Sequence, residues 1–452
     1  MAGDLINGEI PDHWEFTTLG EICQRGGGNI QTGPFGSQLH ASDYVPVGVP
    51  SIMPTNIGEN RIVEDGIVRI TEEDANRLGQ HRLRAGDIVY SLRGDVEKRA
   101  LIREREEGWF CGTGCLKVRL GSGVVDPLFA SLFLGHPAIR EWIVRHAVGA
   151  TMPNLNTTIM SAVPFALPPL AEQKAIAAVL GALDDKIELN RRMNATLEAM
   201  ARALFQSWFV DFDPVRAKLD GRQPVGMDAA NAALFPAAFQ SSQSGPIPAG
   251  WGHTTLAEFC SKITDGAHQS PKSVDAGFPM ASVKDMTDWE INIPSCRHIS
   301  EVDYKSLVAN GCQPELGDIL LAKDGATCLD TACEYQQTDK IVLLSSVAIL
   351  RPKYVCDSAF LHTWLGLSST KTYLKENFVS GSAIPRVVLR DMKRATFISP
   401  PRNILNAFSH AAAPLREQIR HNHEQSRTLA TLRDTLLPKL LSGELSVAEA
   451  MD

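Results

Sequence analysis

The sequence has no long apolar segment. In 452 residues no run approaches the eighteen or more apolar residues of a membrane-spanning helix, and the longest lies at Ala175–Leu183. The opening stretch, MAGDLINGEI, lacks a basic segment followed by an apolar one, so we expect no signal peptide. These two absences predict a cytoplasmic protein without a membrane partner.

Cysteines at metal-binding spacing are also missing. Nine cysteines are scattered along the chain. Cys111 and Cys115 are four positions apart, and Cys328 and Cys333 are five positions apart. Neither pair is accompanied by a second cysteine pair or a histidine pair at zinc-finger spacing. This pattern is typical of free thiols in a reducing cytoplasm, and we expect no metal site.

No catalytic motif is present. The chain contains neither a phosphate loop ending in Gly-Lys-Ser/Thr nor a His-Glu-x-x-His zinc helix. An adenine methyltransferase would need an Asn/Asp-Pro-Pro-aromatic tetrapeptide, and the Pro-Pro pairs here stand in LPPL and SPPR. Arg25–Gly33 is glycine-rich but lacks GxGxxG spacing, and His421 and His423 face apart on an expected helix. We expect no catalytic residue and no cofactor bound by this chain.

The chain as a whole has no excess of positive charge, but two stretches of it do. The net charge is −8. Between Arg77 and Arg105, however, eight basic residues stand against four acidic ones, and between Arg386 and Arg433 nine stand against three. Basic faces on an acidic body suit a protein that contacts a phosphate backbone. For either patch alone, ordinary solvated charge explains the count equally well.

The chain contains an internal duplication. IPDHWEFTTLGEIC at Ile10–Cys23 matches IPAGWGHTTLAEFC at Ile247–Cys260 at eight of fourteen positions. Further stretches correspond in the same order, namely RAGDIVYSLRGD with ELGDILLAKDGA, VGATMPNLN with SGSAIPRVV, and Pro168-Pro169 with Pro400-Pro401. Each copy therefore has a globular part of about 150 residues, a Pro-Pro pair and a helical tail.

Short apolar runs bounded by turn residues predict a mixed fold. DIVYSL, CLKVRL, DILLAK and IVLLSSVAIL are typical of strands. The stretches that follow Asp126 and Asp357 predict a helix or a helix pair, each with the aspartate as N-terminal cap. The fold class expected is α+β, with two duplicated domains of mixed sheet and helices.

The tails carry a seven-residue repeat of apolar positions, which predicts a coiled-coil seam. Asn190 and Asn422 occupy the same slot in the two seams, where a polar residue fixes register. We expect two long helices that pair within one chain; the alternative is two amphipathic helices, each packed on its own domain. Pro414 must kink the second helix or mark its start.

These observations divide the chain into five parts. They are a first globular domain at 1–166, a central helical region at 167–212, a connector at 213–246, a second globular domain at 247–398 and a C-terminal helical region at 399–445. The connector is rich in Pro, Ala, Gly and Ser, so it is not expected to form a third domain.

Loops suited to DNA contact recur in both copies, in Ile30–His40 and Ile263–Ser273. Glycine allows close approach to phosphate, and polar or basic side chains bond to phosphates and base edges. The candidates are Thr32, Gly33, Phe35, Ser37, Gln38, Arg93, Lys98, Asn154, His268, Gln269, Ser270, Lys272, Lys323 and Arg386.

The chain resembles the specificity subunits of type I restriction–modification systems over nearly its whole length. Leu167–Val215 is similar to the central region of that family. TGPFGSQL, GDIVYSLRGD and GATMPNLNT resemble a version of its first target-recognition domain, and ITDGAHQSPK and GSAIPRV a version of its second.

The resemblance implies two target-recognition domains separated by antiparallel helices with pseudo-two-fold symmetry, each reading half of a bipartite, asymmetric site on double-stranded DNA. It implies a bacterial or archaeal complex with two methyltransferase subunits, which use S-adenosylmethionine, and two restriction subunits, which use ATP and Mg²⁺. The main alternative is a duplicated scaffold that binds proteins and not DNA.

A subunit-docking role is also implied for the helical regions. PPLAEQ is intact at Pro168–Gln173, whereas the second copy reads PPRNIL, so a second dock must differ. The residues expected to pair the helices or dock a methyltransferase subunit are Pro169, Glu172, Gln173, Leu183, Ile187, Asn190, Leu197, Leu415, Ile419, Asn422 and Leu429.

Overall fold

A computed structural model describes residues 11–149, 152–381 and 384–447. Ile10, the segment on which the signal-peptide expectation rests, and short parts of two aligned loops (150–151 and 382–383) lie outside the described residues. The chain forms two compact units. The first combines the chain up to Asn190 with the chain from Glu424 onward, and the second is Arg191–His423.

Each unit contains a globular part and a stretch of each of two long helices, α7 (Leu170–Phe209) and α15 (Arg402–Ser442). The remaining strands and α-helices of the first unit are β1 (Glu15–Thr18), α2 (Leu19–Gly26), β2 (Gly27–Thr32), β3 (Tyr44–Val45), β4 (Val49–Ile52), β5 (Val68–Ile70), α3 (Glu72–Arg77), β6 (Ile88–Ser91), β7 (Arg99–Leu101), β8 (Phe110–Cys111), β9 (Cys115–Gly121), α4 (Pro127–Phe133), α5 (Pro137–His146), α6 (Thr157–Ser161) and β10 (Pro164–Leu167).

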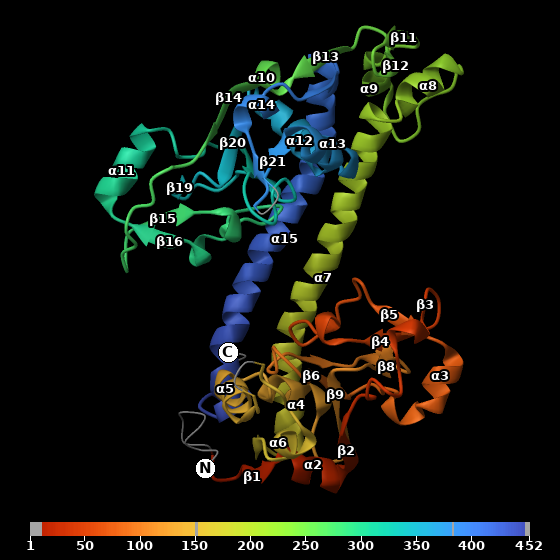
Figure 1. The fold of residues 1–452 in the computed structure, drawn as a ribbon, viewed down its shortest axis with the longest axis vertical. Helices are drawn as coiled ribbons and strands as arrows, with labels where there is room; N and C mark the ends of the chain where they lie inside the picture. The colour runs from red at the N-terminus through yellow and green to blue at the C-terminus, as the bar shows by residue number, and fades with distance from the viewer. Residues whose placement is uncertain (1–10, 150–151, 382–383, 448–452) are drawn as a thin grey trace. The chain divides into compact units, whose positions relative to one another are not determined.

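The central sheet of the first unit has the order β2-β9-β6-β7, and its strands β6, β7 and most of β9 are buried. Ile88 and Tyr90 pack in one cluster with Phe129 of α4. Val89, between them, packs in another cluster with Ile52 of β4, because successive side chains of a strand point to opposite faces. Figure 1 shows α4, α5 and α6 on one side of β6 and β9, and the second sheet, β3-β5-β4-β8, on the other.

The second unit has its own set of elements. They are α8 (Asp213–Leu219), α9 (Ala229–Leu234), β11 (Phe239–Ser242), β12 (Gly245–Pro248), β13 (Gly252–Thr255), α10 (Leu256–Phe259), β14 (Cys260–Asp265), β15 (Phe278–Ala281), β16 (Arg297–Ile299), α11 (Glu301–Ala309), β17 (Ile319–Ala322), β18 (Ala332–Glu334), β19 (Val342–Leu343), β20 (Val347–Pro352), α12 (Ser358–Gly366), α13 (Ser368–Phe378), β21 (Val379–Ser380), β22 (Arg386–Val387), α14 (Leu389–Met392) and β23 (Thr396–Ser399).

The second unit repeats the plan of the first. Its central sheet has the order β14-β20-β17-β18, and its second sheet has the order β16-β15-β19. Ile319 and Leu321 face the cluster that contains Phe360 of α12, whereas Leu320 faces the cluster that contains Leu343 of β19. In Figure 1, α12 and α13 lie on one side of β20 and the strands β15, β16 and β19 on the other. The α+β class and the duplication are confirmed.

The repeated Thr-Thr-Leu triplets begin the same local structure in both units. Thr18 and Thr255 are the N-caps of α2 and α10, and each hydroxyl accepts from the backbone N–H of Glu21 or Glu258. The two glutamates reach back to the cap backbone, which completes a capping box. The preceding strands occupy equivalent places, because β1 pairs with β10 and β13 pairs with β23.

The repeated Gly-Asp-Ile triplets supply an internal ion pair. Asp87 is 2% exposed and Asp318 is 0% exposed. Asp87 accepts from Nε and Nη2 of Arg119 at 2.8 and 2.6 Å, and Asp318 accepts from the same atoms of Arg351 at 2.8 and 2.9 Å. These bonds raise the pKa of both guanidinium groups. Each pair ties the start of one sheet strand to its neighbour.

The expected connector, 213–246, is folded onto the second unit. It contains α8, α9 and most of the β11–β12 hairpin. Val215 is 0% exposed and Phe235 is 1% exposed, and both belong to the cluster that contains Trp208 of α7 and Trp251. The segment is therefore part of a core and not a free linker.

The helices α7 and α15 run antiparallel where they meet within a unit, as expected. In the first unit Asp184 accepts from Arg433 at 2.8 Å, and Asn190 donates to Gln425 at 2.9 Å. Residue numbers therefore rise along one helix while they fall along the other. The helix α15 begins at Arg402 and continues past Pro414, so of the two alternatives expected for this proline, a start of the helix is excluded.

The seam between the helices is polar in its middle. Asn190 is 0% exposed and also donates to Ser426. In the second unit Asn422, which is 2% exposed, donates to Oδ1 of Asn194 at 2.8 Å. The two asparagines expected within the seam are thus both buried in it. Several apolar seam residues are only half-buried, and these are Leu183, Ile187, Leu197, Leu415 and Leu429.

Among the described residues, no helix has both the length and the apolar character needed to cross a bilayer. All nine cysteines are free, and Cys356 is the one that is not fully buried. Burial raises the pKa of the Cys23 and Cys111 thiols to about 12.

Candidate nucleic-acid interface

Two loops that carry predicted DNA-contact residues leave the same end of the central sheet in the first unit. Thr32, the last residue of β2, pairs with Leu116 of β9. Ser91, the last residue of β6, pairs with the residue just before it in β9. The loops 33–38 and 92–98 therefore begin beside the start of β9, on the two strands that flank it.

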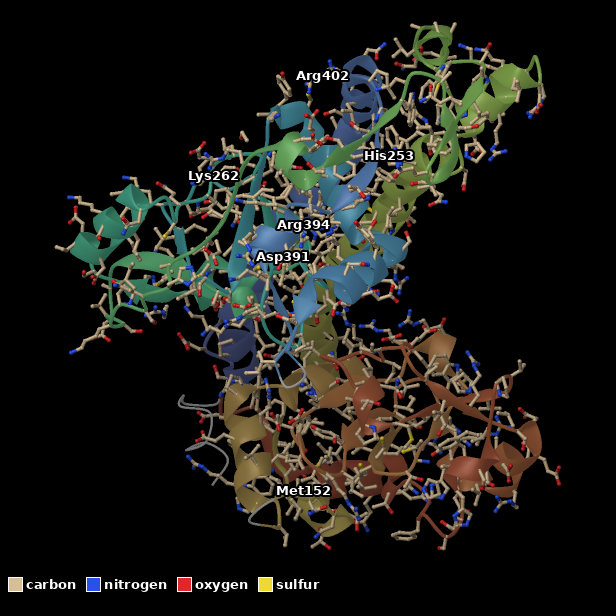
Figure 2. The ribbon with its side chains drawn as sticks, turned by 45° about the horizontal axis from the view of Figure 1, so that its top comes forward. Met152, His253, Lys262, Asp391, Arg394 and Arg402 are labelled. Atoms are coloured by element: carbon tan, nitrogen blue, oxygen red, sulfur yellow. The ribbon has the colours of Figure 1, made fainter. Side chains whose placement is uncertain are left out.

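The stretch around Asn154 is bound to this sheet end. A β-bridge pairs Arg93 with Asn154, and the N–H of Gly94 donates to the carbonyl of Pro153 at 3.0 Å. Met152, which is 56% exposed, lies in the same stretch and is labelled in Figure 2. Three segments that are far apart in sequence thus form one surface, which sequence spacing alone did not show.

The tip of the loop 33–38 is a turn with an aromatic side chain exposed on it. The N–H of Phe35 donates to Oε1 of Gln38 at 3.1 Å, and the N–H of Gln38 donates to the carbonyl of Phe35 at 2.8 Å. Arg77, at the end of α3, donates to the carbonyl of Gln38 at 3.2 Å. The oxygen of Gln38 is therefore used inside the turn, while Phe35 and Ser37 face solvent.

The second unit brings equivalent loops to the equivalent sheet end. Asp265, the last residue of β14, pairs with Ala348 of β20, and Ala322, the last residue of β17, pairs with Val347. The loops that carry His268–Lys272 and Lys323 begin there. Their register reproduces that of the first unit.

The bridge that binds the third segment is also repeated, but with different side chains. Asp324 pairs with Arg386, and the N–H of Gly325 donates to the carbonyl of Pro385 at 3.0 Å. The Nε of Arg386 lies 2.9 Å from Asp324. Where the first unit has an arginine opposite an asparagine, the second has an aspartate opposite an arginine.

Lys323 is directed inward. It is 6% exposed, and its ammonium group lies 2.7 Å from Oδ2 of Asp265. The other oxygen of Asp265 lies 3.2 Å from Nε2 of His268, whose side chain is 74% exposed. Burial and this ion pair remove the Lys323 ammonium from the surface, so the DNA contact predicted for it does not fit the structure. His268, which contacts the same carboxylate, is the exposed side chain of this group.

The remaining candidates differ in how free they are. Arg93 is exposed, whereas Lys98 is held by Asp95 at 2.5 Å. In the second unit Gln269 and Lys272 are exposed. Ser270 accepts from Nη2 of Arg297 at 2.9 Å, and Nη1 of Arg297 donates to the carbonyl of Pro271 at 2.7 Å.

The sequence did not predict the two arginines that bind the loops carrying Gln38 and Ser270. Arg77 comes from α3 and Arg297 from β16, and each reaches a loop that is tens of residues away in the chain. No local pattern marks either residue, because only the fold of the second sheet brings them to the loops. The described residues contain no cluster of His, Cys, Asp or Glu that could hold a metal ion.

The predicted docking residues Glu172 and Gln173 contact their own unit. Gln173 is 1% exposed; its Oε1 accepts from the N–H of Asp126 at 2.8 Å, and its Nε2 donates to the carbonyl of Pro168 at 2.8 Å. Glu172 accepts from Nε1 of Trp14 at 3.3 Å. Gln173 is therefore unable to reach a partner subunit, in contrast to the docking role expected for it. Pro169 is exposed.

The second unit fastens its helix differently. Arg402, labelled at the start of α15 in Figure 2, donates from Nη1 to Asp357 at 3.0 Å, and its guanidinium group stacks on Tyr354 at 3.4 Å. Asp357 occupies the place of Asp126 in the duplication. Asp357 stands at the N-cap position of α12, as expected, but its carboxylate accepts no bond from that helix, whereas the carboxylate of Asp126 accepts from the N–H of Phe129 in α4. The second copy, PPRNIL, thus contacts its aspartate through Arg402, whereas PPLAEQ does so through Gln173.

Comparison with known proteins gives one consistent result. Residues 11–199 match the model of the type I restriction modification DNA specificity domain. The type I restriction enzyme MjaIX specificity subunit of Methanocaldococcus jannaschii is 25% identical over 457 residues, which cover 98% of this chain and 96% of that protein. Residues 11–199 therefore match a type I specificity domain, and the chain is similar to a type I specificity subunit over nearly its whole length.

Two further similarities agree with this family. The type I restriction enzyme HindI specificity subunit of Haemophilus influenzae is 26% identical over 442 residues, covering 88% of this chain and 95% of that one. The crystal structure of a type I restriction–modification S subunit from M. genitalium has the same fold, with a TM-score of 0.52 and 16% identity over 96% of this chain and 97% of that chain.

Proposed function

We propose that this specificity subunit recognises a bipartite, asymmetric DNA sequence and that each unit reads one half of it. The observation that carries the proposal is the repeated sheet end, where two equivalent scaffolds present different side chains. A scaffold that is kept while its exposed residues change is what two different half-targets require. The MjaIX and HindI specificity subunits support DNA over a purely protein-binding scaffold.

The change of side chains supports asymmetry between the two half-targets. Arg93 is exposed in the first unit. Its equivalent in the second unit is Asp324, which forms an ion pair with Arg386. A free arginine and an arginine held by a carboxylate present different donor patterns to base edges and phosphates. The two units are therefore expected to prefer different sequences.

The proposal extends to partners and cofactors. The chain would be a non-catalytic component that positions two methyltransferase and two restriction subunits on DNA. S-adenosylmethionine, ATP and Mg²⁺ would be bound by those subunits and not by this chain. Because Gln173 and Asp357 are engaged within their own units, docking would use the outward faces of α7 and α15.

A salt titration tests DNA binding. In a gel-shift assay with the subunit and its methyltransferase partner, the logarithm of the binding constant should fall linearly with the logarithm of the salt concentration. Arg93→Ala should reduce that slope by about one phosphate contact if Arg93 meets the backbone. Arg222→Ala, an exposed arginine in the folded connector, is the control and should leave the slope unchanged. Binding that is insensitive to salt would favour the scaffold alternative.

A further inference from the structure

In each unit, the loop that follows the first strand of the central sheet (β2 or β14) begins with an equivalent glycine, and this glycine fixes the start of the loop. The N–H of Gly33 donates to the carbonyl of Cys115 at 2.8 Å, and the N–H of Gly266 donates to the carbonyl of Val347 at 3.1 Å. A Cβ atom would lie 2.1 Å from a backbone oxygen at either position. Neither loop can therefore begin differently without moving the sheet, and residues at the same distance from the two glycines are directly comparable.

Two positions beyond each glycine stands an exposed planar ring. Phe35 is 68% exposed, which makes it the most exposed Phe, Tyr or Trp of the described residues. The side chain of His268 is 74% exposed. We propose, on the basis of the function proposed above, that Phe35 and His268 are equivalent base-reading positions, one for each half-target.

Phe35 offers apolar contact alone. Its ring stands on the turn closed by Gln38 and tied to Arg77, so the backbone beneath it is held while the ring remains in water. An exposed phenyl ring gains free energy when a partner covers it. In a DNA groove, the group that such a ring can distinguish is the 5-methyl of thymine. Phe35 therefore selects an A·T pair in the first half-target.

His268 offers a hydrogen bond in a fixed direction. Asp265 accepts from Lys323 at one oxygen, and its other oxygen lies 3.2 Å from Nε2 of His268. A carboxylate is only an acceptor, so the contact places a proton on Nε2 of the ring and leaves Nδ1 as an acceptor in the neutral imidazole. That atom suits a base amino group, N6 of adenine or N4 of cytosine.

The chain supplies a matched pair of control residues. Phe16 and His253 occupy equivalent places in β1 and β13, and both are exposed. They lie on strands outside the two central sheets. Substitution of either removes an exposed ring of the same kind without touching a reading loop. Figure 2 labels His253.

The test maps the methylated adenines in the genome of cells that express the whole complex with Phe35→Ala, His268→Ala, Phe16→Ala or His253→Ala. F35A should relax one A·T position in a single half-target, and H268A should relax one position in the other half. Affinity for the original site should fall about tenfold or more in each case. His268→Phe should not restore it, because a phenyl ring has no acceptor.

The results separate this inference from the proposed function. If the wild-type complex methylates a bipartite sequence and neither F35A nor H268A changes it, the reading positions are refuted while the function stands. Relaxation of both half-targets by one variant, or equal effects of F16A and H253A, also overturns the inference. Absence of any methylated sequence in wild-type cells would instead refute the proposed function.

Discussion

Replacement of Gln173 by leucine should loosen the junction between α7 and the first unit. The side chain is 1% exposed and makes three hydrogen bonds, to the N–H of Asp126 and to the carbonyls of Pro168 and Val124. Leucine has nearly the same size but no polar atom, so the three backbone groups lose their partner.

The expected loss follows from these groups. Pro168 is buried, and Asp126 and Val124 are both half-buried and can regain water in part. Each buried group without a partner costs about 1–3 kcal/mol, and the added apolar burial returns about 1–2 kcal/mol. The net loss should be roughly 2 kcal/mol, which corresponds to a fall of about 4–8 °C in Tm for a unit of this size.

Two measurements check this prediction. Calorimetry should show the lower Tm, and hydrogen exchange should show faster exchange of the Asp126 amide, the group that Gln173 protects. Lys174→Leu, at the exposed neighbouring position of α7, should change neither. If Q173L keeps the Tm and the Asp126 exchange rate of the wild type, the junction is not held by this side chain.

Other contacts give predictions of the same kind. Asp87→Asn and Asp318→Asn should each cost roughly 2–4 kcal/mol in urea unfolding, because each leaves a buried arginine contact without its carboxylate; a cost in one unit alone would contradict their equivalence. Burial raises the pKa of Asp357 and Arg402 opposes it, so Arg402→Met should raise it further. The folded state then binds more protons than the unfolded state, and stability falls as pH rises through that window. Thermal melts should therefore show a greater loss at pH 7 than at pH 4. Cysteines such as Cys23 should react with iodoacetamide only after unfolding, since a thiol with a pKa of about 12 is almost wholly protonated at pH 8.

Local sequence was sufficient for the elements and the duplication. The short apolar runs in DIVYSL and DILLAK predicted β6 and β17, and the heptads predicted α7 and α15. The packing of the connector was not predicted, because its composition resembles a linker and its burial depends on a few residues such as Phe235 that meet the core of a later segment.

The candidate surface was only partly predictable. Glycine-rich loops were recognised in both copies, but the fate of each side chain depended on a distant partner. The side chain of Lys323 is buried in an ion pair with Asp265. The side chain of Gln173 is buried in a hydrogen bond with the backbone of Asp126. Sequence shows neither contact, since the residues are far apart in the chain. Likewise, the sequence Glu172-Gln173 does not indicate whether these side chains bind a partner subunit or their own domain.

The most direct test of the account is an exchange of one reading unit. Residues 10–165 would be replaced by the equivalent part of a relative with a different target, and the methylated sequence of the hybrid complex would be determined across the genome. The account predicts that one half-target changes to that of the relative while the other half stays the same. A change in both halves together, or in neither, would contradict the assignment of one half-target to each unit.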